Sequence, residues 1–352
     1  MFLFATSGQM LSSLRHGKEG QLSELETLAL IASLRKASKL ATARAQSDNP
    51  HVLNSSLNMP ADKLRMLNTV AEALENVSNV VAVVLGGSYA RGFARPASDI
   101  DIGIYYRQAS PCSVDQVRAI AERISTVGSV PIVTGMYEWG PWVNGGAWIQ
   151  TPVGKVDFLY KNLDQVQVVI EEGRQGVWHH DYDQQPPYGF RSVVYFGETY
   201  ICVPLHDPEG EIARLKKFVA EYPEPLRNRI VQESLWGAEF SLRFLRTFFV
   251  NSADVYNAVG CMTRVAQFLV HALFAMNGEY FVSDKYAGRL IEQFVLRPRN
   301  FTPRLERVLS NPGGDSTELG RSSELLSALW LETVELTAGK YKPRFDLKIN
   351  LP

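Results

Sequence analysis

The sequence predicts an α/β domain followed by an all-α helical bundle. Three observations support this prediction. Apolar β-branched runs that end in glycine alternate with helically spaced apolar residues up to about residue 205. After about residue 208 the pattern becomes almost wholly helical. The length of 352 residues also suits two domains, because domains typically contain ~100–200 residues.

Composition and charge narrow the classes of function. The net charge is −1 and no stretch is strongly basic, so we expect no general nucleic-acid binding. The longest clean apolar run is Val80–Leu85, well below the ~20 residues that span a bilayer, so we expect no membrane partner. The opening residues lack a basic region, and the three cysteines form no C-x-x-C pair. These features favour a cytoplasmic location.

Four segments are expected along the chain. Residues 1–58 are polar and serine-rich, with one helix around Ser23–Ala43, and we interpret them as a tail, an accessory helix or an artefact of an upstream start. Residues 59–205 form the predicted α/β catalytic domain, 206–345 the helical bundle and 346–352 a tail.

The α/β domain begins with a helix in which Leu64 and Leu74 mark an apolar face. The run Val80–Leu85 predicts a buried strand, because it is β-branched and ends at two glycines. We also predict a strand at Ile100–Tyr106, a helix at Val114–Val127 and a hairpin whose strands are Ala147–Gln150 and Lys155–Tyr160. The bundle helices are expected at Ile212–Tyr222, Leu226–Phe249, Ala253–Met276, Lys285–Phe294, Pro303–Leu309 and Ser322–Thr337.

The candidate ligand-binding residues begin where the first predicted strand ends. Gly86 and Gly87 let the backbone approach a ligand, and the hydroxyl of Ser88 at a helix start suits a phosphate. Asp99 and Asp101 lie two residues apart in a strand, so both side chains point to one face. Two acids on one strand face repel each other unless a cation compensates, and Mg²⁺ is commonly held by a few carboxylates and substrate phosphates.

The Gly86-Gly87-Ser88 turn, ten residues and then Asp99-Ile100-Asp101 resemble the signature of the nucleotidyltransferase superfamily, which includes DNA polymerase β and the aminoglycoside nucleotidyltransferases. The resemblance covers roughly residues 75–160. It implies a mixed sheet, two Mg²⁺ ions and transfer of a nucleoside monophosphate from an NTP, with ATP expected, to a hydroxyl group.

Such families place a third acid on a neighbouring strand, and Asp157 fits this role. In Lys155–Tyr160 the apolar side chains alternate to one face and Asp157 takes the other. It could complete the metal site or accept the hydroxyl proton. A surface aspartate is the alternative, and Glu138 and Asp164 are weaker substitutes.

Two cations complete the predicted site. Arg91 could reach the triphosphate or pair with an acid near the turn. The segment Asn277–Ala287 resembles the part of some antibiotic nucleotidyltransferases whose lysine meets the triphosphate across the cleft, which implies that role for Lys285. A solvated lysine at a helix start is the competing interpretation.

Several other patterns admit a functional interpretation. Arg264 and His271 form an R-x6-H pair that resembles the ribonuclease motif of small helical toxins of the HEPN group, although satisfied core groups or a cleft-facing acceptor surface also account for them. His179-His180-Asp181 could suggest a metal, but adjacent side chains diverge in an extended chain. The aromatic residues that could stack on a base or belong to the sheet core are Tyr137, Trp139, Trp142 and Trp148.

The sequence therefore predicts an Mg-dependent nucleotidyltransferase that acts on a hydroxyl-bearing small molecule and releases pyrophosphate. One alternative is transfer to a protein or tRNA, as in toxin–antitoxin systems. Another is a nucleotide-binding regulatory module without catalysis. Fold analogy alone does not identify the acceptor.

Overall fold

The computed structural model describes residues 57–347. The predicted helix around Ser23–Ala43, almost all of the predicted extension 1–58 and the last five residues of the predicted tail lie outside the described part of the chain.

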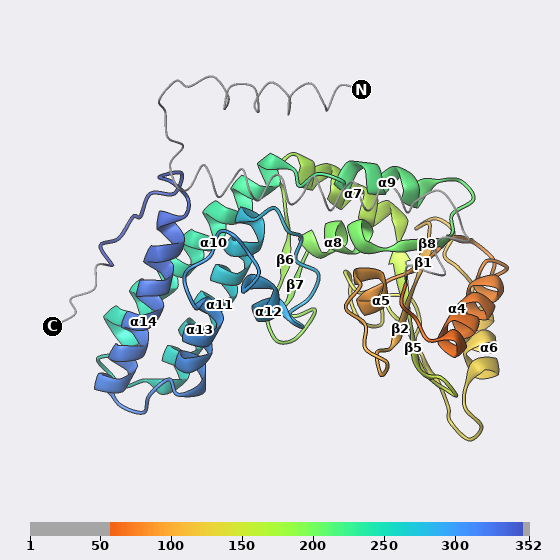
Figure 1. Ribbon diagram of the computed structural model, residues 1–352, viewed down its shortest axis with the longest axis horizontal. Helices are drawn as coiled ribbons and strands as arrows, with labels where there is room; N and C mark the ends of the chain where they lie inside the picture. The colour runs from red at the N-terminus through yellow and green to blue at the C-terminus, as the bar shows by residue number, and fades with distance from the viewer. Residues whose placement is uncertain (1–56, 348–352) are drawn as a thin grey trace, which may run out of the picture.

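A six-stranded mixed sheet in the order β3-β4-β5-β2-β1-β8 organises the first half of the described chain (Figure 1). β2 runs parallel to β5, whereas the other neighbouring pairs are antiparallel. The strand bounds are β1 Val80–Leu85, β2 Ile100–Tyr106, β3 Ile132–Val133, β4 Gly146–Thr151, β5 Gly154–Asn162 and β8 Val203–His206. The predicted α/β fold with a mixed sheet is confirmed.

One face of the sheet is buried under two helices. α4 (Ala61–Leu74) and α6 (Val114–Ile124) lie on the same side of the sheet in Figure 1. Alternate residues of β2, from Ile100 to Tyr106, pack against these helices in one hydrophobic cluster. Because side chains alternate along a strand, the residues between them, including Asp101, must face the other way.

The opposite face of the sheet meets the C-terminal half of the molecule. Ala82, Val84 and Tyr105 point to this side and belong to a second hydrophobic cluster, which continues from Leu163 to Leu347. α7 (Leu163–Arg174), α8 (Val193–Ile201) and α9 (Glu211–Val219) contribute buried residues to this cluster. The short helix α5 (Gly87–Arg91) contacts β2. α7 and α8 lie within the predicted 59–205 segment, yet their buried residues join the cluster of the bundle.

The helical bundle follows as predicted (Figure 1). Its central pair is α10 (Glu224–Phe244) and α11 (Val255–Met276), packed against α14 (Ser316–Glu335). The remaining elements are a π-helical turn at Leu245–Phe249, α12 (Ala287–Ile291) and α13 (Phe301–Ser310). A small hairpin, β6 (His180–Asp181) and β7 (Phe190–Arg191), lies between bundle and sheet.

Three predicted helices differ most from the structure. The predicted helix Ser322–Thr337 begins six residues after the observed start of α14 at Ser316. The predicted helix Leu226–Phe249 changes from α-helical to π-helical geometry at Leu245. The predicted helix Lys285–Phe294 is reduced to Ala287–Ile291, because Tyr286 has a left-handed backbone conformation with φ of 66° that starts the helix only after it.

α11 is the one helix among residues 57–347 that is long and apolar enough to cross a membrane by length and composition. In its most apolar stretch, 56% of the window is buried inside the protein. It contacts α10, α14 and the π-helical turn, so its apolar character matches its place in the bundle core.

Candidate active site

The turn after β1 is held against the aspartate strand by its backbone. The N–H of Gly86 donates to the carbonyl oxygen of Asp101 over 2.8 Å. Gly86 then caps α5, which carries Ser88 in its first turn and begins one residue earlier than the predicted start at Ser88. The turn therefore places the backbone N–H groups and the Ser88 hydroxyl beside the carboxylates.

Gly87 is required at its position for two reasons. Its φ is +60°, in the left-handed region. A Cβ atom there would lie 1.7 Å from Oδ2 of Asp101, closer than any real contact. Only glycine lets the turn and the Asp101 carboxylate occupy adjoining space.

The three predicted acids meet on one face of the sheet. β2 and β5 are parallel, and their register pairs Asp101 directly with Asp157. Asp99 lies immediately before β2, and its Oδ2 is 3.9 Å from Nζ of Lys155. Side chains alternate along a strand, and Val156 and Phe158 are buried in the core on one face of β5. Asp157 lies between them and therefore points to the opposite face, where the other acids are.

Burial and the crowding of these acids alter their proton affinity. Burial, then the charges of Asp157 and Asp99, raise the pKa of Asp101 to about 6, and Lys285 acts in the opposite direction. Burial also raises the pKa of Asp157, while Lys155 and Lys285 lower it. Burial is the largest cause of both shifts and the mutual repulsion of the acids adds to it, so a bound cation would be favoured at these carboxylates.

One atom of this cluster has no partner in the part of the chain that the structure describes. Oδ1 of Asp157 is buried and forms no hydrogen bond within the described residues. A buried carboxylate oxygen without a hydrogen-bond partner can bind a metal ion or accept a proton. Residues 57–347 contain no group of three or more His, Cys, Asp or Glu side chains that is already arranged to hold a metal ion. Mg²⁺ sites of phosphate-transferring proteins usually keep water and add substrate phosphates to one or two carboxylates, so the donor set here is suitable.

A cleft of about 850 Å³ brings the predicted residues together. The sheet side supplies Gly86, Gly87, Ser88, Arg91 and the three acids. The bundle side supplies Lys285 from the segment between α11 and α12, close enough to influence the charges of Asp101 and Asp157. All eight predicted site residues line this one cleft.

The cleft floor also contains a pair that the sequence analysis missed. Lys161 of β5 and Glu198 of α8 form an ion pair over 2.7 Å, with the lysine side chain 8% exposed. Lys161 lies four residues after Asp157 and so shares its strand face. That alternation could have identified the lysine, but its partner on α8 depends on tertiary packing.

Several weaker candidates lie outside the cleft lining. Asp164 pairs with Arg107 over 2.8 Å, and Glu138 packs beside Gly135. Neither lines the cleft, so neither replaces Asp157. Among the aromatic candidates, Trp139 stacks on Trp148 away from the cleft.

Tyr137 and Trp142 do not line the cleft and instead contact neighbouring side chains. The Tyr137 hydroxyl bonds to Gln108 and Asn162, and Trp142 stacks on Phe190. A base-stacking role for these aromatic residues therefore has no support in this geometry.

The histidine patterns also have structural explanations. His179 contacts Glu172 over 2.7 Å, and His180 bonds to the carbonyl oxygen of Tyr188, so they do not converge on a metal. His271 is 3% exposed beneath Trp178 and Phe281, which keeps it from an RNA substrate. The R-x6-H interpretation is thus disfavoured, because Arg264 lies at the surface and His271 in the core.

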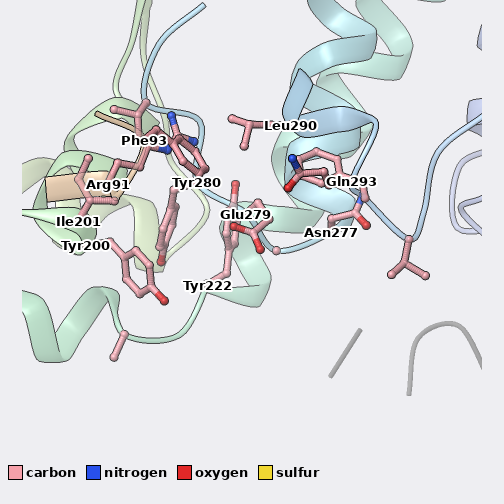
Figure 2. A pocket seen from close by; sticks show the side chains of 15 residues that line it. Arg91, Phe93, Tyr200, Ile201, Tyr222, Asn277, Glu279, Tyr280, Leu290 and Gln293 are labelled. Atoms are coloured by element: carbon pink, nitrogen blue, oxygen red, sulfur yellow. The ribbon is translucent and has the colours of Figure 1, made fainter. Parts of the chain in front are cut away.

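A second cavity of about 470 Å³ adjoins the cleft. Arg91 and Phe93 line both spaces. In Figure 2, Arg91, Tyr200 and Tyr280 lie on one side of this cavity and Leu290, Gln293 and Asn277 on the other. Burial lowers the pKa of Arg91 and nearby Glu279 raises it, so the guanidinium lies within electrostatic reach of a carboxylate in the second cavity.

Replacing Gly87 by alanine should damage both stability and ligand binding. The left-handed backbone alone costs about 1–2 kcal/mol, and the new Cβ must also displace the Asp101 carboxylate. Gly92→Ala is a matched control, since Gly92 has φ +76° with nothing within 4 Å of its added Cβ. We expect only Gly87→Ala to abolish binding of magnesium tripolyphosphate, measured by calorimetry beside chemical unfolding. Equal effects of the two changes would contradict the close approach.

Neutralising Asp101 should stabilise the metal-free protein. In the unfolded chain this carboxyl has its ordinary pKa of 3.8, against about 6 when folded, so the folded state binds the proton more tightly. The wild type therefore loses stability as the pH rises from about 4 to about 6.

At pH 7.5, Asp101→Asn should raise the free energy of unfolding by about 1–3 kcal/mol, and the gain should shrink towards pH 4. Urea unfolding in EDTA at both pH values measures this difference. A loss of stability in the variant at pH 7.5 would mean that the ionised carboxylate is structural.

Comparisons with known proteins agree with this geometry. Residues 67–133 match the family described as the nucleotidyltransferase domain. This range includes the glycine-serine turn, Asp99 just before β2 and Asp101 within it. Residues 202–287 match a domain of unknown function (DUF4037), a range that ends just after Lys285. A search of curated proteins found no match.

Among solved structures, the chain is similar to a nucleotidyltransferase-like protein from Exiguobacterium sibiricum 255-15, with 9% identity and a TM-score of 0.38 over 78% of this chain and 76% of that one. The matched domain and the residues that it contributes to the cleft lead to one conclusion: the chain carries a domain of the nucleotidyltransferase family and is a nucleotidyltransferase.

Proposed function

We propose that this nucleotidyltransferase transfers AMP from ATP to a hydroxyl group of a small molecule in an Mg²⁺-dependent reaction. The main support is that one cleft gathers a phosphate-binding turn, three carboxylates and a lysine from the bundle. Its volume of about 850 Å³ suits a nucleotide beside a small acceptor. ATP as the donor is proposed from the family resemblance.

The reaction needs chiefly positioning and charge neutralisation. The acceptor oxygen forms a bond to the α-phosphorus, the bond from that phosphorus to the bridging oxygen breaks, and pyrophosphate leaves. Asp99 and Asp101, with Asp157, would hold up to two Mg²⁺ ions, which neutralise phosphate charge when bound. The Gly86-Gly87 backbone and Ser88 bind the outer phosphates.

Asp157 is suited to accept the acceptor's hydroxyl proton. Its Oδ1 has no partner among the described residues, and burial raises its pKa towards the working pH, where a general base is most effective. Lys285 and Arg91 would oppose the charge of the triphosphate and of the departing pyrophosphate. In this proposal every residue that touches the phosphates is a hydrogen-bond donor or a cation.

The alternative acceptors are weaker on the present observations. A tRNA acceptor needs a basic surface, whereas the net charge of the chain is −1. A binding module without catalysis has no use for the raised pKa of Asp157 beside the phosphate turn. A cytoplasmic location is part of the same proposal, supported by three free cysteines.

Pyrophosphate release tests the proposal. With Mg²⁺, each of the four NTPs and a mixed library of hydroxyl compounds, the wild type should release pyrophosphate and label an acceptor detectable by mass. Asp99→Asn and Asp101→Asn should remove nearly all release, and Asp157→Asn should reduce it by ~10²–10⁴-fold as expected for a lost general base.

Asp115→Asn provides the control, because Asp115 is exposed on α6 behind the sheet. It should retain full activity. Release within a few-fold of wild type in Asp101→Asn would contradict the assignment of the carboxylates. Labelling of protein or tRNA in place of small molecules would instead select the other acceptor class.

A further inference from the structure

A lysine occupies a core position on the buried face of α4. The buried residues of this helix recur at helical spacing and form one stripe, which consists of Lys63, Leu67, Val70 and Leu74. Lys63 is 5% exposed, although lysine is rarely buried to this extent without a partner. The contacts of its ammonium group must therefore offset the cost of burial.

The ammonium group of Lys63 meets three other segments of the chain. Its Nζ donates a hydrogen bond to the carbonyl oxygen of Ser98 over 2.5 Å. Nζ also lies 5.6 Å from the ring centre of Tyr89 in α5, within the range of a cation–π contact. At the turn between β4 and β5, a Cβ atom added to Gly154 would lie 3.7 Å from Nζ. The lysine thus joins α4 to three segments that contribute residues to the active-site cleft.

The hydrogen bond to Ser98 acts on the peptide group that precedes Asp99. The carbonyl oxygen of Ser98 and the N–H and Cα of Asp99 belong to one planar peptide unit. A partner that holds the oxygen therefore also restricts rotation of that plane. The side chain of Asp99 starts from an atom of the restrained plane, so its direction depends on this bond.

Asp99 needs such an anchor more than the other two acids do. Asp101 and Asp157 lie within β2 and β5, where the strand register pairs them directly. Gly86 also donates to the carbonyl oxygen of Asp101. Asp99 lies one residue before the start of β2 at Ile100, outside the strand. The position of its backbone therefore depends on the turn that precedes it.

That turn is closed by its own hydrogen bonds. The N–H of Ser98 donates to the carbonyl oxygen of Arg95 over 2.8 Å, and the N–H of Arg95 donates to the Ser98 hydroxyl over 2.8 Å. These two bonds hold the turn together without fixing where it lies on the protein. The bond from Lys63 supplies a long-range contact, since 35 residues separate the two partners.

The packing of α4 alone does not explain a lysine at position 63. An apolar side chain of similar length, such as methionine, would fill the same stripe without the cost of burying a charge. It would not donate a hydrogen bond to the Ser98 carbonyl oxygen. Hydrogen bonds from a charged donor are also stronger than those between neutral groups, which suits an anchor.

We propose that Lys63 is a positioning residue that orients the Asp99 carboxylate for metal binding through the Ser98–Asp99 peptide. The proposal rests on the metal-binding role given to Asp99 in the proposed function. Lys63 does not line the cleft and touches no substrate, so its effect passes through the backbone of the turn.

Exchange of individual amide hydrogens in the free protein tests the positioning. Lys63→Met removes the donor and keeps an unbranched side chain in the core. It should speed exchange of the Arg95 and Ser98 amides about tenfold, the effect of losing roughly one hydrogen bond. The amides of Ile102 and Ile104 in β2 should keep their rates, because the strand register does not depend on Lys63.

Val70→Ala is the matched control, because Val70 is fully buried on the same face of α4. It should destabilise the core without changing exchange in the turn. Unchanged exchange in Lys63→Met, or equal acceleration in Val70→Ala, would overturn the proposal. Failure of both Lys63→Met and Lys63→Gln to fold would also overturn it, in favour of a purely structural role.

Metal affinity connects the position of the turn to the site. The probe is Mn²⁺ with tripolyphosphate, which is independent of base and acceptor, and binding is measured by electron paramagnetic resonance. Lys63→Met should weaken binding about five- to tenfold, whereas Val70→Ala should leave it unchanged.

Asp99→Asn separates this proposal from the proposed function. If Asp99→Asn weakens binding of Mn²⁺ and Lys63→Met does not, Lys63 does not orient this carboxylate and the proposal is overturned. If neither change affects binding while exchange in the turn is faster in Lys63→Met, the result contradicts only the metal-binding role of Asp99.

Discussion

The register between β2 and β5, which holds three carboxylates together on one sheet face, is the constraint on which the active site depends. The parallel register of β2 and β5 fixes Asp101 beside Asp157, and neither side chain can turn away without placing an acid in the core. The opposite face, packed under α4 and α6, holds that register. Burial in this packed core thus maintains a charge arrangement that is unfavourable by itself.

Local sequence patterns predicted those parts of the site that lie on strands and turns. The strands Val80–Leu85 and Ile100–Tyr106 have the predicted bounds. The first is a β-branched run that ends at a glycine turn, which defines its end. Strand alternation likewise predicted that Asp157 would oppose the core residues beside it. These features depend on neighbours within a few residues.

Features formed between distant segments escaped the sequence analysis. The Lys161–Glu198 pair joins a strand to a helix that was not anticipated, and the contacts of Lys63 come from Ser98 and Tyr89 on separate segments. The same limitation applies to α12, whose late start follows from the backbone of Tyr286 and not from helix propensity. Each needs the tertiary arrangement, which spacing in one sequence does not define.

The distribution of the hydrophobic core determines which parts of the cleft can move. Ala82, Val84 and Tyr105 of the sheet share one cluster with α7, α8 and the bundle, so the two walls of the cleft are joined by a continuous core. Closure by rotation of whole domains would have to break that packing. Exposed segments can adjust at a lower cost in free energy. Two of them meet at the cleft, because Arg95 before β2 lies 6.0 Å from the centre of the Tyr286 ring and both residues line the cleft. Adaptation to the substrate is therefore expected in the 92–97 and 282–286 segments, with the carboxylate strands as the fixed reference.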